Sequence, residues 1–448
     1  MDMKVLLMTP LSVFLVLPPS IPDLGLGYLA TALRKNGFEV LVRDWSPRLM
    51  PDELVSLLKT HCPDVVGIKV FTKDASGARK TIAIIREILP EAAVVIGGPH
   101  PSACEPVSLM TDFDQADFAI RGEAEEALPR LLKLVQAQRG RQSLRDGELC
   151  LIPGLVFRGS GGVICNAVEF KKNLDDLGYP SWDLIDPRKY ATVMLGSSSD
   201  SPVAPLVTTR GCPGFCTYCS AFAISGRKIR ARSPQNIFNE IRILHDKFGV
   251  RRFMFTDNCF TSILGNLVDL CKLIISSDMR IEWDYASYET LANLTDENLA
   301  MMRQAGCTMI HMGIETGSER IRATINKRSD LSDISEKVRS IKRSGIGLTA
   351  WFMLGFPGEC LSDMLQTIRY AFGIKADRLE FSLVLPLPGS AVCEGMKQQY
   401  AMTDIRWSQF EKLQPPYALS RLSIWQLSIL LRLVRLALRF RRHLCWRV

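Results

Sequence analysis

The chain has 448 residues, of which 47% are hydrophobic and 23% are charged, a composition that excludes an intrinsically disordered protein. Its length allows two or three domains, each with its own core. The net charge of +8 is concentrated near the carboxyl end, where residues 419–448 carry seven arginines and no acidic residue. The rest of the chain is close to neutral, so the sequence does not indicate a nucleic-acid-binding protein.

The first apolar stretch, Val5–Leu17, has the length of a secretory signal core. Four prolines between residues 10 and 22 interrupt or follow it, only Lys4 is basic, and no small-residue cleavage site follows. We therefore expect a buried strand and loop. No run of about 18 apolar residues occurs, which predicts that no segment spans a membrane. The thirteen cysteines are unpatterned outside one loop, which predicts mostly reduced thiols in the cytoplasm.

Residues 1–138 alternate short apolar segments with amphipathic ones, which is the pattern of a parallel sheet covered by helices on both faces. Five such units predict a flavodoxin-like doubly wound sheet, in which ligands bind beyond the carboxyl ends of the first and third strands. This places a ligand between the loop 9–24 and the loop 70–75. Strands are expected at Lys4–Met8, Glu39–Val42, Val65–Lys69, Ala93–Ile96 and Phe118–Ile120, and helices at Gly27–Lys35, Pro51–Lys59, Ser76–Ile88, Cys104–Met110 and Ala124–Gln136.

Residues 139–195 lose this alternation and contain Gly159-Ser160-Gly161-Gly162, so we expect a linker with a short hairpin. In residues 196–395 the alternation returns in six strand–helix units, which fit a partial (β/α)6 barrel better than a second open sheet. Barrels of this type carry their chemistry on the loops at the carboxyl ends of the strands. The strands are expected at Pro205–Thr209, Arg252–Phe255, Ile281–Ala286, Met309–Met312, Leu348–Phe352 and Arg378–Leu383.

The segment Arg210–Cys219, directly after the first barrel strand, contains three cysteines in a CxxxCxxC pattern with an aromatic residue before the last one. Glycine and proline prevent a regular helix, so we expect a loop that wraps around one object. Three thiolates on such a loop can hold three irons of a cubane cluster and leave the fourth iron open. A structural zinc loop is the alternative, but zinc usually takes four ligands in paired CxxC units. A disulfide is disfavoured in so tight a loop.

Polar or glycine-rich elements follow four of the later barrel strands. Asp257 and Asn258 follow the second strand and can bind the amino end of a zwitterion, and Glu315 ends the fourth, where it can accept hydrogen bonds from a ribose. Gly355 begins a turn after the fifth strand, where bare backbone can approach an adenine, and Pro386–Ser390 closes the sixth unit. Each element alone is more typical of a turn, but four at one end of a barrel favour a binding site.

Residues 203–392 resemble the radical S-adenosylmethionine (SAM) superfamily, through the cysteine motif and these strand ends. The resemblance implies that Cys212, Cys216 and Cys219 bind a four-iron four-sulfur cluster and that SAM chelates the fourth iron. It also implies that one-electron reduction cleaves SAM to methionine and a 5′-deoxyadenosyl radical, which takes hydrogen from carbon.

The same resemblance assigns SAM contacts to the strand ends. Tyr218 is expected beside the adenine, the Asp257–Asn258 element at the SAM amino group, Glu315 at the ribose and Gly355 at the adenine. Two departures from close relatives are visible. Thr256-Asp257 stands where they often have paired acids before Asn258, and Ser287–Thr290 lacks the arginine that they often carry near the end of the third strand.

Residues 3–135 resemble the cobalamin-binding domain that precedes the barrel in one large subgroup of this superfamily. The matching segments are Leu24–Ala30, Ile96–Pro101 and Arg121–Glu125. Glycines at these strand ends let backbone approach a bulky tetrapyrrole and its nucleotide tail. The residues expected to contact cobalamin are Gly25, Gly27, Val70, Phe71, Thr72, Gly97, Gly98, Gly122 and Glu123.

The DxHxxG motif of cobalamin proteins with a histidine ligand to cobalt is absent, and residues 9–24 contain no histidine. If cobalamin binds, we therefore expect its lower face to lack a histidine ligand. His100 is a candidate ligand, although a loop histidine beside prolines more often forms backbone hydrogen bonds. The alternative for the whole domain is a degenerate module that binds nothing.

Residues 396–448 are expected to form a helical extension with a helix over Ser423–Arg442. Arg432, Arg435, Arg439 and Arg442 recur every three or four residues and share one face, while leucines cover much of the remainder. Such a helix can lie on an anionic membrane surface. It can equally pack on the barrel with its arginines in solvent, and the sequence leaves both interpretations open.

The motifs together predict a cobalamin-dependent radical SAM enzyme that methylates an unactivated carbon of a small substrate, which can be apolar. The alternatives are a non-methylating oxidative cyclase or rearrangement enzyme, as in the anaerobic magnesium-protoporphyrin ester cyclase, and a non-catalytic cobalamin or redox sensor. The expected partners are the small-molecule substrate and a low-potential electron donor such as flavodoxin or ferredoxin, with no nucleic acid. The expected location is the cytoplasm, with peripheral contact at the inner face of the membrane as an option.

Overall fold

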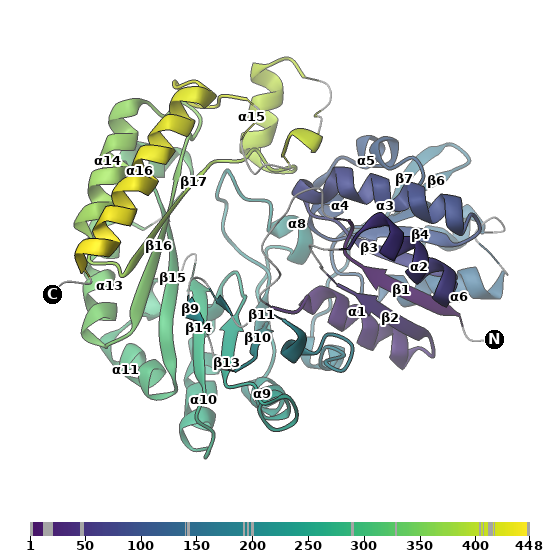
Figure 1. The fold of residues 1–448 in the computed structure, drawn as a ribbon, viewed down its shortest axis with the longest axis horizontal. Helices are drawn as coiled ribbons and strands as arrows, with labels where there is room; N and C mark the ends of the chain where they lie inside the picture. The colour runs from purple at the N-terminus through teal and green to yellow at the C-terminus, as the bar shows by residue number, and fades with distance from the viewer. Residues whose placement is uncertain are drawn as a thin grey trace.

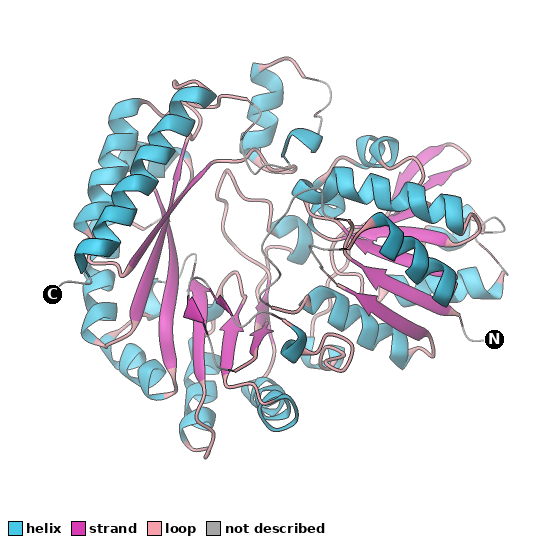
Figure 2. Cartoon of the chain, in the orientation of Figure 1, coloured by secondary structure: helices cyan, strands magenta, loops and turns pink. Residues whose placement is uncertain are grey.

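The computed structural model describes residues 3–445 except for 12–20, 45–48, 139, 141–143, 191–192, 195–196, 199–200, 288–290, 328, 403–404, 406, 411–414 and 416. Two α/β domains lie side by side, and a long helix, α16 (Ile424–Cys445), runs along the outside of the second (Figure 1). Figure 2 shows that each domain has its strands on the inside and its helices on the outside. The predicted fold class, a flavodoxin-like sheet followed by a partial barrel and a helical segment, is confirmed.

The N-terminal sheet has seven strands in the order β2-β1-β3-β4-β5-β6-β7, and the first five are parallel. The order 2-1-3-4-5 is flavodoxin-like and puts its switch point between β1 and β3. β6 and β7 form an antiparallel hairpin that pairs with β5, so the hairpin expected in the linker belongs to this sheet. The strands are β1 (Lys4–Met8), β2 (Glu39–Arg43), β3 (Val65–Lys69), β4 (Ala93–Gly97), β5 (Phe118–Ile120), β6 (Leu155–Gly159) and β7 (Gly162–Cys165).

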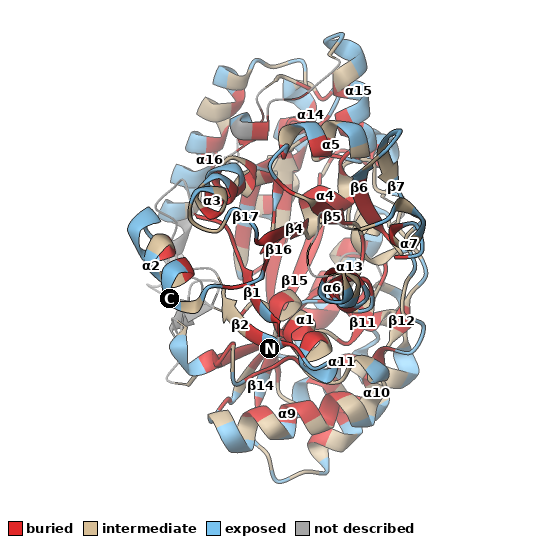
Figure 3. Cartoon of the chain, turned by 90° about the vertical axis from the view of Figure 1, so that its right-hand side faces the viewer, coloured by how far each residue is buried: buried red, intermediate tan, exposed pale blue. Residues whose placement is uncertain are grey.

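Consecutive side chains of each N-terminal strand pack against opposite helix layers. Val5 and Leu7 of β1 pack with α1 and α6, whereas Leu6 and Met8 pack with α2, α3 and α5. Because both faces are covered, these strands are continuous apolar runs, and Figure 3 shows the sheet buried between partly exposed helices. The helices are α1 (Leu24–Lys35), α2 (Pro51–His61), α3 (Ala75–Ile88), α4 (Pro99–Ala103), α5 (Pro106–Asp112), α6 (Ala127–Ala137) and α7 (Asp146–Leu149).

The second sheet has six parallel strands in sequence order, β10-β13-β14-β15-β16-β17, with helices along its outer side (Figure 1). Sequential order without a closing strand pair is that of an incomplete βα barrel, as predicted. The strands are β10 (Val203–Leu206), β13 (Arg252–Phe255), β14 (Glu282–Ser287), β15 (Cys307–Glu315), β16 (Gly347–Leu354) and β17 (Arg378–Leu383). The helices are α9 (Pro234–Phe248), α10 (Leu264–Ile275), α11 (Asp296–Gln304), α12 (Glu319–Thr324), α13 (Leu331–Arg343) and α14 (Leu361–Gly373).

Residues between the two sheets tie the domains together. Trp182 and Ile185 of the linker enter the barrel core, and the Trp182 indole N–H donates a 2.9 Å hydrogen bond to the buried Glu240 of α9. At the other end of the barrel, α15 (Ala391–Gln399) and the short helix η7 (Trp407–Phe410) contribute Met396, Trp407 and other side chains to the core of the N-terminal domain. The domains therefore share cores on two sides of the crevice between them.

The leucine face of α16 packs on the barrel. Leu427, Leu431 and Val434 are buried in the barrel core, and the outer side exposes Trp425 and Phe440, together with Leu433, Leu436 and three arginines. The structure thus places the helix on the barrel, as the second of the two sequence interpretations expected. Arg447 lies outside the described residues. Within the described part of the chain, no helix is long and apolar enough to cross a membrane.

Candidate functional site

The three cysteines lie on an irregular loop between two short strands, β11 (Thr209–Arg210) and β12 (Arg230–Ala231), at the carboxyl end of β10. All three are partly exposed. The loop starts with Gly211 at φ +98°, where an added Cβ would lie 2.2 Å from the Lys228 carbonyl oxygen. Only glycine fits both this backbone conformation and this close approach.

Arg227 holds the middle of the cysteine loop in shape. Its guanidinium donates a 2.6 Å hydrogen bond to the Gly214 carbonyl and lies 4.1 Å from the ring centres of both Phe215 and Phe222. The Ala221 N–H points at the Cys219 sulfur at 3.4 Å, and burial raises the pKa of this thiol. The loop is thus fixed by its own contacts and presents three sulfurs on one irregular turn. This arrangement fits a cluster with three protein ligands.

Asp257 supports the start of this loop. One carboxylate oxygen accepts hydrogen bonds from the backbone N–H and the hydroxyl of both Thr208 and Thr209, at 2.7–3.0 Å for three of the four. The other oxygen is buried without a hydrogen-bond partner, and burial raises the pKa of the group. Asn258 lies next to it and is partly exposed. The structure therefore gives Asp257 a supporting role that the sequence does not indicate, while its second oxygen stays available for a ligand.

Glu315 and Tyr218, predicted at the ribose and the adenine, are brought together. Burial and the negative charge of Glu315, to which the phenol is hydrogen-bonded, raise the pKa of Tyr218. Glu315 has φ +73°, a strained conformation for a residue with a side chain, at the point where the pairing of β15 with β16 shifts register. Lys327, which sequence reasoning missed, lies 3.7 Å from the Glu315 carboxylate. Strain that persists in a polar cluster is typical of functional sites.

The turn that begins at Gly355 is closed by Glu359. The N–H groups of Gly355 and Phe356 donate hydrogen bonds of 2.6 and 2.9 Å to the Glu359 carboxylate. These two N–H groups are therefore occupied, whereas the sequence led us to expect bare backbone that an adenine can approach. Gly355 has φ +96°, and an added Cβ would lie 3.3 Å from Leu427 of α16. The ring of Phe356 contacts Tyr218 edge-on at 5.7 Å, so this turn supports the cysteine loop through packing.

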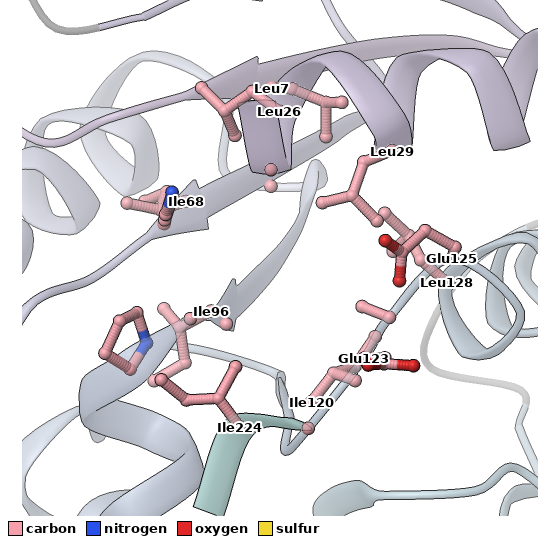
Figure 4. Close-up of a pocket in the computed structure, with 18 of the residues that line it drawn as sticks. Leu7, Leu26, Leu29, Ile68, Ile96, Ile120, Glu123, Glu125, Leu128 and Ile224 are labelled. Carbon is pink, nitrogen blue, oxygen red and sulfur yellow. The ribbon is translucent and has the colours of Figure 1, made fainter. Parts of the chain in front are cut away.

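A cavity of about 370 Å³ lies at the carboxyl ends of β1, β3, β4 and β5 (Figure 4). Leu26 and Leu29 of α1 line one side, and Ile224 of the short helix α8 (Phe222–Ser225) lies opposite. Its lining is mainly aliphatic, and the described residues that form it include no histidine. Of the residues predicted to contact cobalamin, the structure places these in the lining: Gly25, Phe71, Gly97, Gly98, Gly122 and Glu123.

Three predicted cobalamin contacts lie elsewhere. Gly27 packs on the linker, where an added Cβ would lie 2.5 Å from Ile185. Val70 is fully buried in the core. Thr72 turns away from the cavity and lies 3.3 Å from His100. The sequence predicted the strand end correctly but not which side chains of β3 and α1 face the cavity. The loop 12–20, expected on the other side of the ligand, lies outside the described residues.

His100 does not line the cavity either, although Gly98 and Pro99 just before it do. It is fully buried, and its ring contacts Phe113 and Trp407 edge-on at 5.9 and 5.3 Å. Burial lowers the pKa of His100 to about 3, so it stays neutral. The structure therefore places His100 in the domain core.

Ion pairs join the N-terminal domain to the cysteine loop. Arg210, which precedes the first cysteine, lies 2.7 Å from Glu125 and 3.5 Å from Glu123. Arg230, at the end of the loop, binds both oxygens of Glu123 at 2.7 and 2.8 Å. Burial alone would raise the pKa of Glu125, but Arg210 holds it below its ordinary value. These largely buried pairs fix the position of the cysteine loop relative to the cavity.

Lys69 is a further lining residue that the sequence did not indicate. Its ammonium group lies 2.7 Å from Asp23, the N-cap of α1, and 5.1 Å from the ring centre of Phe71. The pair adds polar groups to the mainly aliphatic cavity near the switch point between β1 and β3. Lys69 and Asp23 are far apart in the sequence, and only the fold brings this strand-end lysine to the acidic helix cap.

Comparison with protein families gives two matches, one for each of the two domains described above. The model of the radical SAM superfamily matches residues 206–371, and the model of the B12 binding domain matches residues 11–132. The first covers the barrel with its cysteine loop, and the second covers the sheet with its cavity. The chain therefore carries a B12-binding domain followed by a radical SAM domain.

Curated relatives of this radical SAM protein are similar over most of its length. An uncharacterised methyltransferase of Pyrococcus horikoshii is 28% identical over 95% of this chain and 92% of its own. Cytidylyl-2-hydroxyethylphosphonate methyltransferase of Streptomyces wedmorensis is 26% identical over 86% of this chain and 80% of its own. The anaerobic magnesium-protoporphyrin IX monomethyl ester cyclase of Cereibacter sphaeroides is 25% identical, over 89% of this chain and 64% of its own.

Solved structures share the fold at lower sequence identity. The radical SAM methyltransferase TsrM of Kitasatospora setae, solved with cobalamin and a [4Fe-4S] cluster, superposes with a TM-score of 0.70 at 21% identity, covering 91% of this chain and 80% of its own. The cobalamin-dependent radical SAM enzyme OxsB gives a TM-score of 0.70 at 18% identity, covering 98% of this chain and 62% of its own. Both have the predicted order of a cobalamin domain and a barrel.

The cofactors of this radical SAM enzyme are a four-iron four-sulfur cluster, SAM and cobalamin. The cluster fits the loop with Cys212, Cys216 and Cys219, which leaves one iron without a protein ligand from the motif. Cobalamin fits the N-terminal cavity, where five glycines line the surface and a side chain at Gly25 or Gly98 would meet Lys69 at 3.0–3.2 Å.

Proposed function

We propose that the protein methylates an unactivated carbon of a small substrate in the crevice between its two domains. The observation that carries this proposal is that one segment, residues 210–226, both bears the cysteine motif and lines the cavity through Arg210, Ile224 and Ser225. The two cofactor sites would therefore open onto the same space. When bound, the cluster with SAM supplies hydrogen abstraction from carbon, and cobalamin supplies the methyl group.

In the barrel, three residues of this chain would bind SAM, each at a different group of the molecule. Glu315 would accept hydrogen bonds from the ribose, with the ammonium group of Lys327 3.7 Å from its carboxylate holding it in place. Tyr218 would lie along the adenine, held by Glu315 on one side and by Phe356 on the other. Asp257 would offer its second oxygen, which is buried and lacks a partner, to the SAM amino group.

In the N-terminal domain, the glycine-lined and aliphatic surface would hold cobalamin by shape and exclude water from the space between the cofactors. Glu123 and Glu125 lie at the edge of this surface and are fixed by arginines of the cysteine loop. This arrangement would keep the distance between the two cofactors constant. The aliphatic lining is also compatible with an apolar substrate.

The methyltransferase names of the relatives from Pyrococcus and Streptomyces, which match most of both chains, support methyl transfer. A non-methylating cyclase is the second candidate, because anaerobic magnesium-protoporphyrin cyclases from three organisms are also similar at 23–25% identity. The cyclase from Cereibacter is longer than this chain, which covers 64% of it.

The test is an anaerobic reconstitution with iron, sulfide and hydroxocobalamin, followed by SAM and a low-potential reductant such as reduced flavodoxin or ferredoxin. Products are identified by mass spectrometry. We expect 5′-deoxyadenosine together with S-adenosylhomocysteine from the reconstituted protein. We expect the 5′-deoxyadenosine to disappear in Cys216→Ala, because one cluster ligand is lost. Cys150→Ala, which removes an exposed thiol outside the motif, is the matched control and should leave both products unchanged.

The outcomes separate the candidate functions. 5′-deoxyadenosine without S-adenosylhomocysteine, in the presence of bound cobalamin, would contradict methyl transfer and favour the cyclase or rearrangement chemistry. Bound cofactors without any SAM cleavage would contradict both and favour a cobalamin or redox sensor.

We also propose a peripheral contact between α16 and an anionic membrane surface. The outer side of the helix exposes Trp425 and Phe440, and no acidic residue lies between residue 412 and the end of the chain. Aromatic and basic side chains on one helix surface favour an anionic interface. Co-sedimentation with vesicles containing phosphatidylserine should fall when Arg432, Arg435 and Arg439 are changed to glutamine. Equal binding by both proteins would contradict the contact.

A further inference from the structure

A fourth cysteine lies against the cluster motif. Cys259 follows β13, two residues after Asp257, and is far from the CxxxCxxC loop in sequence. Its side chain is 2% exposed, and its sulfur lies 3.6 Å from the sulfur of Cys212, with the Cys259 thiol in position to donate. This distance is normal for a hydrogen bond between sulfurs and is too long for a disulfide.

Two sets of contacts hold Cys259 in this position. Asp257 accepts hydrogen bonds from Thr208 and Thr209, so the end of β13 and the start of the cysteine loop are joined two residues before Cys259 and three residues before Cys212. On the other side, Phe260 stacks on Phe255 at 4.6 Å between ring centres, with the planes 24° apart. The contact between Cys259 and Cys212 is thus built into the barrel and does not depend on a mobile side chain.

We propose that Cys259 is a positioning residue that donates an S–H···S hydrogen bond to the iron-bound Cys212 and thereby raises the reduction potential of the cluster. The inference rests on the proposed function in that it takes Cys212 as a cluster ligand. Hydrogen bonds to cluster sulfurs are among the factors that set cluster potentials. Reduction adds one negative charge, so a donor beside a ligating sulfur stabilises the reduced form more than the oxidised form. The electron itself comes from a low-potential donor protein, and Cys259 is neither oxidised nor reduced.

The test is a redox titration of the reconstituted cluster, followed by electron paramagnetic resonance, in the wild type, Cys259→Ala and Cys259→Ser. Substrate and methyl transfer are not needed. We expect Cys259→Ala to keep four irons per chain and to shift its midpoint to lower potential. The ratio of reduced to oxidised cluster at a fixed potential should fall about tenfold, which corresponds to 59 mV for a one-electron couple. Cys259→Ser retains an O–H donor and should restore most of the wild-type midpoint.

Cys271→Ala is the matched control, because Cys271 of α10 is an equally buried thiol within the barrel core. Its midpoint should equal that of the wild type. Identical midpoints in the wild type and Cys259→Ala, with full iron content in both, would overturn the proposal. Loss of iron in both Cys259 variants would also overturn it, since Cys259 would then be a ligand or a folding residue. A wild type that binds no cluster would instead contradict the proposed function.

Discussion

The two sides of the crevice between the domains differ in the side chains that line them. The N-terminal side consists of five glycines and a mainly aliphatic lining, with few polar groups. The barrel side consists of ionisable groups that already have partners, such as Glu315 with Lys327 and Asp257 with two threonines. A large cofactor such as cobalamin can be held by shape, whereas a cluster and SAM need individual ligands and charges. We therefore expect single substitutions to act mildly on the first side and strongly on the second or at the junction.

The strongest effect is expected at the junction, from Arg210→Met. This change removes the partner of Glu125 and leaves a buried carboxylate unpaired, which should cost about 3–5 kcal/mol. Urea unfolding of the full chain is the measurement. Arg34→Met is the control, because Arg34 and Asp183 form an exposed pair worth about 1 kcal/mol or less. Equal losses in the two variants would show that the ionic junction does not hold the domains together.

The free energy of unfolding should depend on pH through Glu359, which lies on the barrel side of the crevice. Burial raises the pKa of its carboxyl from the ordinary 4.5 to about 7. The unfolded chain releases this proton at lower pH than the folded protein, so stability falls as pH rises from about 4.5 to about 7. The loss should be about 3 kcal/mol, since each pKa unit corresponds to 1.36 kcal/mol.

Glu359→Gln is the variant that isolates this titration. It stays neutral and keeps an acceptor for the N–H groups of Gly355 and Phe356. The difference in free energy of unfolding between wild type and variant should follow the pH curve of one carboxyl with its midpoint near 7 in the folded state. A difference that is constant between pH 4.5 and 8 would contradict the assignment.

A smaller loss is expected from Gly211→Ala at the start of the cysteine loop. The alanine would occupy φ +98° and meet the Lys228 carbonyl, which should cost about 2 kcal/mol and reduce the iron content after reconstitution. Gly249→Ala is the control, because Gly249 also has a positive φ, +68°, but no atom lies within 4 Å of the added Cβ. If both variants bind iron equally, the close approach at Gly211 does not shape the cluster loop.

No effect on the cobalt environment is expected from His100→Gln. The histidine lies in the domain core between Phe113 and Trp407 and does not line the cavity. The electron paramagnetic resonance spectrum of bound cob(II)alamin should be the same in the wild type and the variant. A nitrogen splitting that is present in the wild type and absent in His100→Gln would show that His100 is a ligand.

Much of the fold could be predicted because its strands are buried on both faces. Val65–Lys69 and Phe118–Ile120 are apolar runs whose bounds the structure reproduces, and their spacing implied parallel pairing. The hairpin around Gly159 was also predicted, but not its pairing with β5. Pairing of a hairpin with a sheet depends on which edge strand is exposed after the first five strands assemble.

The site was predictable where a motif defines it and not where tertiary contacts define it. The cysteines are adjacent in sequence, so their spacing indicated the cluster. Lys327 and Cys259 approach the site from distant elements, and no spacing rule points to them. Val70 was assigned to the cavity from its place at a strand end, but side chains at consecutive positions point to opposite faces. Acidic residues at 123 and 125 together with arginines flanking the cysteines could have indicated the junction by charge alone.

The central claim is that cobalamin and the cluster face one crevice at a fixed separation. Pulsed electron paramagnetic resonance on the chain loaded with both cob(II)alamin and the reduced cluster tests this directly. We expect a magnetic interaction between the two paramagnets in the wild type, with a broader distribution of separations in Arg210→Met. Full loading with both cofactors and no interaction between them would contradict it.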